Sequence, residues 1–203
     1  MSDNHIYPIF DTILQPKDKE QLLGQTAKVF WMVGLSGSGK STLARALENA
    51  LFEKGFKTML LDGDNLRTGI NNNLGFSQED RTENIRRAAE VSKLFASSGL
   101  VTICSLISPT EKIRKMAKEI IGQDTFEEVF IECPIEVCEQ RDVKGLYAKA
   151  RKGEIKDFTG ISSPFEAPTD ADIVVNTAAH ELNESLDLLV NYVLGKIQPA
   201  PNK

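Results

Sequence analysis

The chain has 203 residues, which suits a domain of ordinary size that buries its own core. Its net charge of -5 argues against a general nucleic-acid binder, which usually carries a basic excess. No apolar stretch approaches the ~20 residues that span a bilayer, and residues 1–10 lack the basic and apolar segments of a secretory signal. The cysteines form no CxxC pair. We therefore expect a cytoplasmic protein with reduced thiols and with neither a membrane nor a nucleic-acid partner.

From residue 28 onward, short apolar runs alternate with segments of helical spacing. The apolar runs predict strands at residues 29–33, 58–61, 100–106, 128–133 and 173–175. The helical spacing predicts helices at residues 41–54, 79–98 and 110–121, and a C-terminal helix that starts near residue 182. This alternation predicts an α/β fold, a parallel sheet with helices on both faces. Ligands of such sheets bind beyond the carboxyl ends of the strands.

The two ends of the chain differ from this pattern. Residues 1–27 show little apolar periodicity and contain Pro8, Pro16 and a charged run at residues 17–20, so we expect an N-terminal arm or a short helix there. The alternating pattern predicts one domain over residues 28–198. We expect residues 199–203 to be a frayed tail.

The first predicted strand is followed by the segment GLSGSGKST, which matches the GxxxxGK[ST] pattern of a P-loop. Its glycines let successive backbone N–H groups point at phosphate oxygens, Lys40 reaches the β- and γ-phosphates, and the Ser41 hydroxyl takes a Mg²⁺ position. The alternative is a Gly/Ser-rich turn that merely starts a helix. Because a strand precedes the segment and a helix follows it, we predict a P-loop NTPase-type fold. The predicted ATP-binding residues here are Gly34, Leu35, Ser36, Gly37, Ser38, Gly39, Lys40, Ser41 and Thr42.

Two carboxylates follow the second predicted strand. Asp62 can hold Mg²⁺ through water, as the strand-end Asp of P-loop proteins does. Asp64 can orient an acceptor hydroxyl or accept its proton, and Arg67 follows three residues later. Alone, two carboxylates around a glycine equally suit a solvated turn. The neighbouring P-loop favours the functional interpretation.

The helix that begins after Ser77 carries Arg81 and Asn84, which are three residues apart and share one face. Such a face can bind an anionic acceptor through the guanidinium and the amide. The alternative is a solvated charged surface with internal ion pairs, which fits Arg86 and Arg87 better. Spacing does not decide between these interpretations for Arg81.

Ser108 precedes Pro109 after the third predicted strand, at the carboxyl edge of the sheet near the P-loop. From the residues alone, a helix N-cap or a turn serine before proline is the simpler interpretation. Arg114, in the following helix, can serve either the phosphates or the helix surface.

A basic segment bracketed by glycines covers residues 138–153 and continues as a loop to Pro168. In a P-loop chain, this predicts a small lid, at about residues 141–168, that closes over the nucleotide. The alternative is an exposed helix and loop with solvated charges. Phe158 can stack on a purine or attach the loop to the core.

Taken in order, these segments resemble the adenylylsulfate kinase family of P-loop kinases. The similar segments are the P-loop, LDGDNLR at 61–67, LGFSQEDR with NIRR at 74–87, ISP at 107–109, RDVKGLY at 141–147 and FTGI at 158–161. The resemblance covers about residues 17–195. The P-loop alone indicates only a superfamily, whereas the later segments are far more specific.

The resemblance implies that the γ-phosphoryl of ATP is transferred, with Mg²⁺, to the 3′-hydroxyl of adenosine 5′-phosphosulfate in sulfate assimilation. The product is 3′-phosphoadenosine 5′-phosphosulfate. By matching positions, Asp64 and Lys40 would be catalytic, Ser108 would be the family's phosphoserine position, and Arg141 would flank the adenine of ATP. The implied acceptor-binding residues are Arg67, Phe76, Arg81, Asn84, Lys144 and Phe158. A homodimer is also implied.

Three other interpretations stay open at this point. The chain can be another small-molecule kinase, acting on a nucleoside monophosphate or a sugar acid, although residues 62–87 favour the phosphosulfate acceptor. It can be a nucleotide-binding switch that transfers nothing, which would not depend on Asp64. It can also be the catalytic half of a larger sulfate-activating assembly that binds a sulfurylase in trans.

Overall fold

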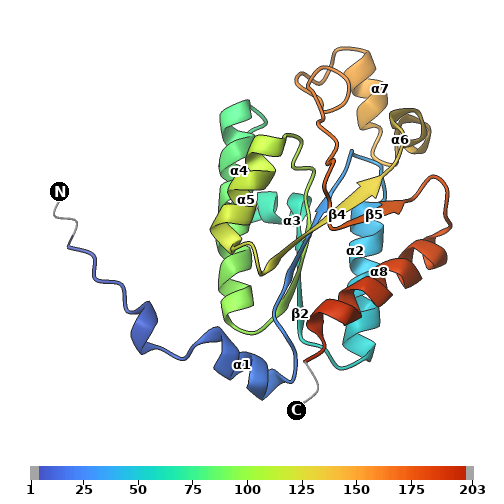
Figure 1. Ribbon diagram of the computed structural model, residues 1–203. Coiled ribbons are helices and arrows are strands. Elements are labelled where there is room, and N and C mark those ends of the chain that lie inside the picture. Colours follow the sequence, from blue (N-terminus) through green and yellow to red (C-terminus); the bar gives the residue numbers. More distant parts are fainter. Residues whose placement is uncertain (1–4, 200–203) are drawn as a thin grey trace.

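Five parallel strands form the centre of the computed structural model, which describes residues 5–199 (Figure 1). They are β1 (Val29–Val33), β2 (Thr58–Asp62), β3 (Val101–Ser105), β4 (Phe126–Glu132) and β5 (Ile173–Asn176). Their order in the sheet is β2-β3-β1-β4-β5, and every pairing is parallel. The predicted α/β fold is therefore confirmed.

Helices cover both faces of this sheet (Figure 1). On one face lie α4 (Gln78–Ser97) and α5 (Glu111–Ile121), and on the other lie α2 (Lys40–Glu53) and α8 (Leu182–Ile197). Shorter helices are α1 (Pro16–Leu23), α3 (Gly63–Thr68), α6 (Ile135–Arg141) and α7 (Leu146–Arg151), with a 3₁₀ turn at Phe10–Thr12. None of the helices described between residues 5 and 199 is long and apolar enough to cross a bilayer.

The central strand β1 is buried on both faces, and its side chains alternate between two cores. Trp31 and Val33 pack with α4 and α5, whereas Phe30 and Met32 pack with α2 and α8. Fully burying a side chain of this size contributes about 1.5–3 kcal/mol, so this five-residue strand stabilises both layers. It also places the P-loop, which follows Val33, at the carboxyl edge of the sheet.

Two elements differ from the sequence prediction by more than one residue at an end. Strand β4 begins at Phe126 rather than residue 128, because Phe126 and Glu127 pair with β1. Glu127 is buried although it is charged, so it interrupts the apolar pattern that predicts a strand. Its carboxylate forms ion pairs with Lys28 and Lys196, at 2.9 and 3.0 Å. Residues 63–68 form α3 instead of a simple turn, and Asp62 caps this helix by accepting the Asp64 N–H at 3.0 Å.

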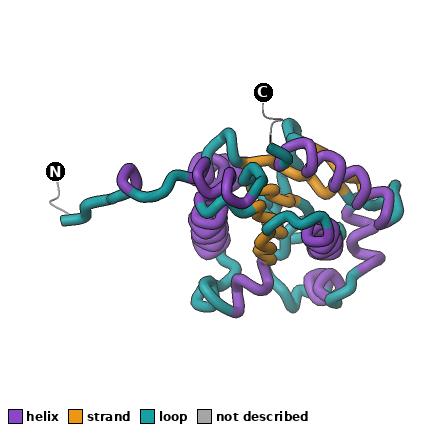
Figure 2. The backbone as a smooth tube through the Cα atoms, turned by 90° about the horizontal axis from the view of Figure 1, so that it is seen from below, coloured by secondary structure: helices purple, strands orange, loops and turns teal. Residues whose placement is uncertain are grey.

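The N-terminal segment has two parts. Residues 5–15 run away from the sheet, and all of them are exposed (Figures 1 and 2). Helix α1 is joined to the domain, because Glu20 accepts the Ala27 N–H at 2.7 Å and Lys19 donates to the Ser97 carbonyl at 3.1 Å. Of the predicted frayed tail, Pro199 is described, and residues 200–203 lie outside the described residues.

Candidate active site

A cleft of about 1140 Å³ lies beyond the carboxyl ends of β1, β2 and β3, and residues of α6 and α7 also line it. It brings together most of the residues singled out in the sequence. Those lining it are Ser36, Gly37, Gly39, Lys40, Ser41, Thr42, Asp62, Asp64, Arg67, Phe76, Arg81, Asn84, Ser108, Arg141, Lys144 and Phe158. Gly34, Leu35 and Ser38 of the P-loop lie outside the lining.

The P-loop is packed too closely for larger residues at its first position. A Cβ on Gly34 would lie 2.6 Å from the Ile131 carbonyl oxygen and 2.8 Å from Ser38 Oγ, so a side chain cannot fit there. Gly39 has φ +97° and precedes α2, whose N-terminus faces the cleft. A helix N-terminus and its free N–H groups favour a phosphate at this point.

The Lys40 side chain is enclosed by this loop. Its Nζ donates to the carbonyl oxygens of Gly34 and Leu35 at 2.8 and 2.6 Å. Burial lowers the pKa of Lys40 to about 8, although the Asp62 and Asp64 carboxylates oppose this shift. Phosphate oxygens would give the ammonium stronger partners than two carbonyl groups do.

Oxygen atoms from three elements meet beside Lys40. Ser41 Oγ donates to Asp62 Oδ2 at 2.6 Å and lies 3.2 Å from Ser105 Oγ. Hydroxyl and carboxylate oxygens at a phosphate site are the ligands that Mg²⁺ prefers, and this ion usually keeps several waters. The donor set therefore fits a Mg²⁺ bound to nucleotide.

The far end of the cleft combines an aromatic ring with guanidinium groups. Phe76 is 61% exposed, and the guanidinium carbons of Arg67 and Arg81 lie 4.4 and 5.8 Å from the centroid of its ring. Arg67 also donates to the carbonyls of Leu74 and Gly75, at 3.1 and 2.8 Å. The cationic groups at this end of the cleft suit an anionic ligand that also offers a flat face.

The segment predicted to be a lid, about residues 141–168, lies against both the P-loop and α4. Tyr147 Oη donates to the Ser36 carbonyl at 2.8 Å, and Arg81 donates to the Asp157 carbonyl at 2.6 Å and to Thr159 Oγ1 at 3.1 Å. Lys144 forms an ion pair with Asp64 across the cleft. These contacts connect the lid to three parts of the domain.

Phe158 fits both interpretations made from the sequence. Its ring lines the cleft, and it also packs edge-on against Tyr147, with the ring centroids 5.0 Å apart. The side chain is buried, in one cluster with Leu35 and Cys138.

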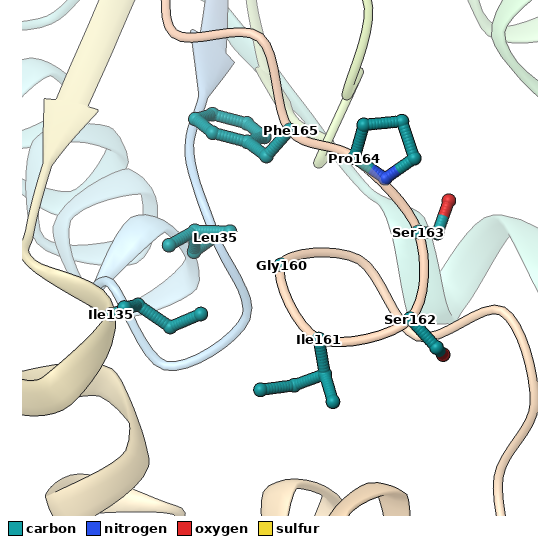
Figure 3. A pocket seen from close by; sticks show the side chains of 8 residues that line it. All are labelled: Leu35, Ile135, Gly160, Ile161, Ser162, Ser163, Pro164 and Phe165. Atoms are coloured by element: carbon teal, nitrogen blue, oxygen red, sulfur yellow. The ribbon is translucent and has the colours of Figure 1, made fainter.

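The lid loop also borders a second hollow of about 520 Å³ (Figure 3). Leu35 and Ile135 point toward the loop at Gly160, while Ser162 and Ser163 point away from it. A Cβ on Gly160 would lie 3.0 Å from both Leu35 and Ile135. Leu35, a residue of the P-loop, therefore packs against the loop at Gly160 and does not line the cleft.

Arg141 and the segment after β5 close the end of the cleft beside the P-loop. Arg141 donates to the Thr177 carbonyl at 2.6 Å, and Thr177 Oγ1 donates to the Ser38 carbonyl at 2.7 Å. Thr177 and the residues that follow it are not among the predicted site residues, although several of them line the cleft. Their position just after the last strand could have revealed them, because ligands bind at strand ends.

Arg114 neither lines the cleft, where phosphates would bind, nor lies on the exposed surface of its helix. Its Nε lies 2.8 Å from Glu128 Oε1 in a buried ion pair, and its Nη1 donates to the carbonyls of Ser108 and Glu166, at 3.2 and 2.8 Å. It joins α5, β4 and the end of the lid. Ser108 is not the N-cap of α5, which is Thr110. Ser108 is 1% exposed, and its Oγ accepts the Trp31 indole N–H at 2.9 Å.

The charged helix surface beside the site is as expected. Arg86 and Arg87 pair with Glu83 at 2.7 and 2.8 Å. Ser77 caps α4 by accepting the Asp80 N–H at 3.1 Å. The interpretation as solvated ion pairs is confirmed for these two arginines, whereas Arg81 faces the cleft.

A comparison with protein families decides between the kinase classes that this geometry allows. The model described as adenylylsulphate kinase matches residues 26–176, more than half of the chain. The chain belongs to the adenylylsulphate kinase family. The matched range of the family runs from just before β1 to the end of β5, so it includes the P-loop, α3, α4 and the predicted lid.

Relatives within the adenylylsulphate kinase family are similar over most of the chain. The adenylyl-sulfate kinase of Bacteroides thetaiotaomicron is 60% identical over 195 residues, which are 96% of this chain and 97% of that protein. The Mycobacterium tuberculosis APS kinase CysC, solved in complex with AMPPNP and APS, has a TM-score of 0.79 at 43% identity. That match covers 83% of this chain and 98% of the solved one. The predicted family is thus confirmed.

Proposed function

We propose that the chain transfers the γ-phosphoryl group of ATP to the 3′-hydroxyl of adenosine 5′-phosphosulfate (APS). The products are ADP and 3′-phosphoadenosine 5′-phosphosulfate, an activated sulfate for assimilation. The observation that carries the proposal is one cleft in which a P-loop faces a site with an aromatic ring and two guanidinium groups. Family membership and the relative solved with AMPPNP and APS support the same pair of substrates.

The proposed transfer is a direct in-line displacement. The acceptor oxygen bonds to the γ-phosphorus, the bond to the β–γ bridging oxygen breaks, and the hydroxyl proton passes to the Asp64 carboxylate. Before this step, Asp64 must leave its ion pair with Lys144 and contact the acceptor hydroxyl instead. Lys40 and the P-loop N–H groups hold the β- and γ-phosphates, with Arg141 beside the adenine of ATP.

The acceptor is proposed to bind at the far end of the cleft. Arg67, Arg81 and Asn84 would donate to its phosphosulfate group, since these side chains line the cleft. Phe76 and Phe158 would contact its adenine. Lys144 would approach it from the lid, and its Asp64 partner is nearby.

A Mg²⁺ ion bound with ATP would be held by Ser41 directly and by Asp62 through water. When bound, it neutralises charge on the β- and γ-phosphates. The Asp62–Ser41 hydrogen bond of 2.6 Å holds the hydroxyl next to the phosphate end of the cleft.

We assign Ser108 a structural place in the site rather than a covalent one. Its hydroxyl oxygen accepts from Trp31, and the side chain is almost wholly buried. An in-line transfer needs no phosphoserine, because the hydroxyl and the γ-phosphate react with each other.

The test is phosphoryl transfer by the purified chain with Mg-ATP and APS, with the nucleotides resolved by ion-exchange chromatography. We expect a new 3′-phosphorylated product and an equal amount of ADP. A panel with AMP, another nucleoside monophosphate and a sugar acid is run beside it. ADP formation with one of these acceptors, and none with APS, would overturn the proposed acceptor while leaving a P-loop kinase.

We further propose a homodimer of chains with one catalytic domain each, at residues 28–198 with a lid at about 141–168. A hexameric APS kinase from Thiobacillus denitrificans, similar at a TM-score of 0.64 and 25% identity, supports assembly in this family, although the match covers only 30% of that chain. Light scattering after size-exclusion chromatography checks the mass. A sulfurylase that binds in trans would be a partner in addition to the second copy of this chain.

The cytoplasm is the proposed location, because it supplies ATP and keeps thiols reduced. The three cysteines are free and buried. Burial raises the pKa of both Cys104 and Cys138 to about 12, so these two stay protonated and unreactive there.

A further inference from the structure

Asn71 lies in the loop after α3 and is completely buried. Its side-chain Nδ2 donates to Asn84 Oδ1 at 3.0 Å. Asn84 is 6% exposed and lines the cleft, whereas Asn71 does not. Asn71 therefore reaches the site only through Asn84.

The loop that carries Asn71 is held firmly against α4. Arg87 donates to the Ile70 carbonyl at 2.9 Å and to Asn73 Oδ1 at 2.8 Å. The Asn71 backbone N–H donates to the Leu66 carbonyl at 2.9 Å. These contacts place the Asn71 amide at a set position beside Asn84.

Asn71 is a poor choice for stability alone. Its Oδ1 is buried and has no hydrogen-bond partner in the described part of the structure. A buried, unsatisfied acceptor destabilises a fold, so an apolar side chain of similar size would be better at this position. What the amide provides is the donor that reaches Asn84.

We propose that Asn71 is a positioning residue that orients the Asn84 amide for the anionic acceptor. An asparagine amide has one accepting oxygen and one donating NH₂ group. The Asn71 donor occupies the Asn84 oxygen, so Asn84 turns its NH₂ toward the cleft. An anion needs donors, and a carbonyl oxygen in that place would repel it. The inference rests on the proposed function, because it requires an anionic acceptor at this end of the cleft.

Removing the donor should weaken acceptor binding in a defined way. In Asn71→Leu, the Asn84 oxygen is free to turn to water while the cleft is empty. Acceptor binding would then force that oxygen against an apolar side chain, where it has no partner. We expect the KM for APS to rise about tenfold, which is typical of leaving one buried polar group unpaired. The KM for ATP should stay within twofold.

The test is a double-mutant cycle in the full chain, with Asn71→Leu, Asn84→Ala and the double variant. If Asn71 acts through Asn84, Asn71→Leu has no further effect on the KM for APS once Asn84 is alanine. Equal effects of Asn71→Leu in both backgrounds, or an unchanged KM for APS in the single variant, would overturn the proposal. The Tm of each variant separates these effects from loss of structure.

Asn71→Asp provides a second variant if the leucine does not fold. A carboxylate only accepts hydrogen bonds, so it draws the Asn84 NH₂ away from the cleft, and we again expect a raised KM for APS that disappears in the Asn84→Ala background. An effect that persists there would come from charge alone and would contradict the proposal. Turnover of APS by the unaltered chain is measured in the same assay, so a failure of the proposed function is seen separately.

Discussion

At the scale of single residues, the Lys40 ammonium is held in a place where its charge is poorly stabilised. Burial outweighs the opposing charges of the Asp62 and Asp64 carboxylates, so the pKa of Lys40 falls to about 8. In the proposed complex, the phosphates of ATP bring negative charge to the same point. Nucleotide binding should therefore raise the pKa of Lys40 again, which couples binding to proton uptake.

That coupling predicts a buffer-dependent binding enthalpy. At about pH 8.5, more than half of Lys40 is neutral in the free protein, so Mg-ATP binding should take up roughly half a proton or more. Uptake should fall toward pH 7, where Lys40 is already charged. Titration calorimetry in buffers of different ionisation enthalpy measures it. Lys40→Arg is the control, because arginine stays charged; a wild-type enthalpy independent of the buffer would contradict the prediction.

Asp64 is the second residue whose chemistry can be isolated. Asp64→Asn removes the proton acceptor but keeps the size of the side chain, so we expect kcat to fall at least ~100-fold with little change in ATP binding. The same change breaks the ion pair with Lys144. Lys144→Met breaks that pair and keeps the carboxylate. If both variants lose the same turnover, the ion pair and not proton transfer explains the loss.

At the scale of elements, the lid depends on a few contacts made by α7 and the loop after it. Tyr147→Phe removes the hydrogen bond to the Ser36 carbonyl, which typically contributes about 1 kcal/mol. Because Ser36 belongs to the P-loop, we expect the KM for ATP to rise about fivefold. Tyr192→Phe is a matched control, since that hydroxyl donates to Glu127 in β4. Equal effects of the two changes would indicate general loosening instead of a lid contact.

A buried ion pair joins α5 to β4. Burial raises the pKa of Glu128, and the Arg114 guanidinium opposes that shift. Arg114→Met should destabilise the fold by about 3–5 kcal/mol, because it leaves a carboxylate buried without its partner. The double variant Arg114→Met/Glu128→Leu should recover much of this loss in urea denaturation. A double variant as unstable as the single one would show that the Ser108 and Glu166 contacts matter more than the pair.

At the scale of the whole molecule, the N-terminal segment divides into a part that stabilises the domain and a part that does not. Residues 5–15 are all exposed, so removing residues 1–14 should change the free energy of unfolding by less than about 0.5 kcal/mol. Removing residues 1–23 also deletes α1 and its contacts to Ala27 and Ser97, and should lower the Tm clearly. An equal loss in both truncations would mean that residues 5–15 are covered in solution.

Much of the fold could be predicted from the sequence because its signals are local. The runs that became β1, β2 and β3 are apolar, the helices have capping residues such as Ser77 and stop signals such as Gly55, and the P-loop is one contiguous motif. Strand β4 was predicted two residues short because a charged residue, Glu127, occupies a buried position. Its partners, Lys28 and Lys196, are far away in the sequence.

The sequence by itself determined the P-loop and the alternating fold, since both depend on residue type and spacing, and its motifs carried the resemblance to the family. Tertiary structure alone decided that Arg114 pairs with Glu128, that Thr177 completes the nucleotide end and that Asn71 contacts Asn84. Each of these contacts joins segments that are separated along the chain. The packing of the sheet and helices determines which donor lies next to which acceptor. A local sequence pattern does not predict these pairs.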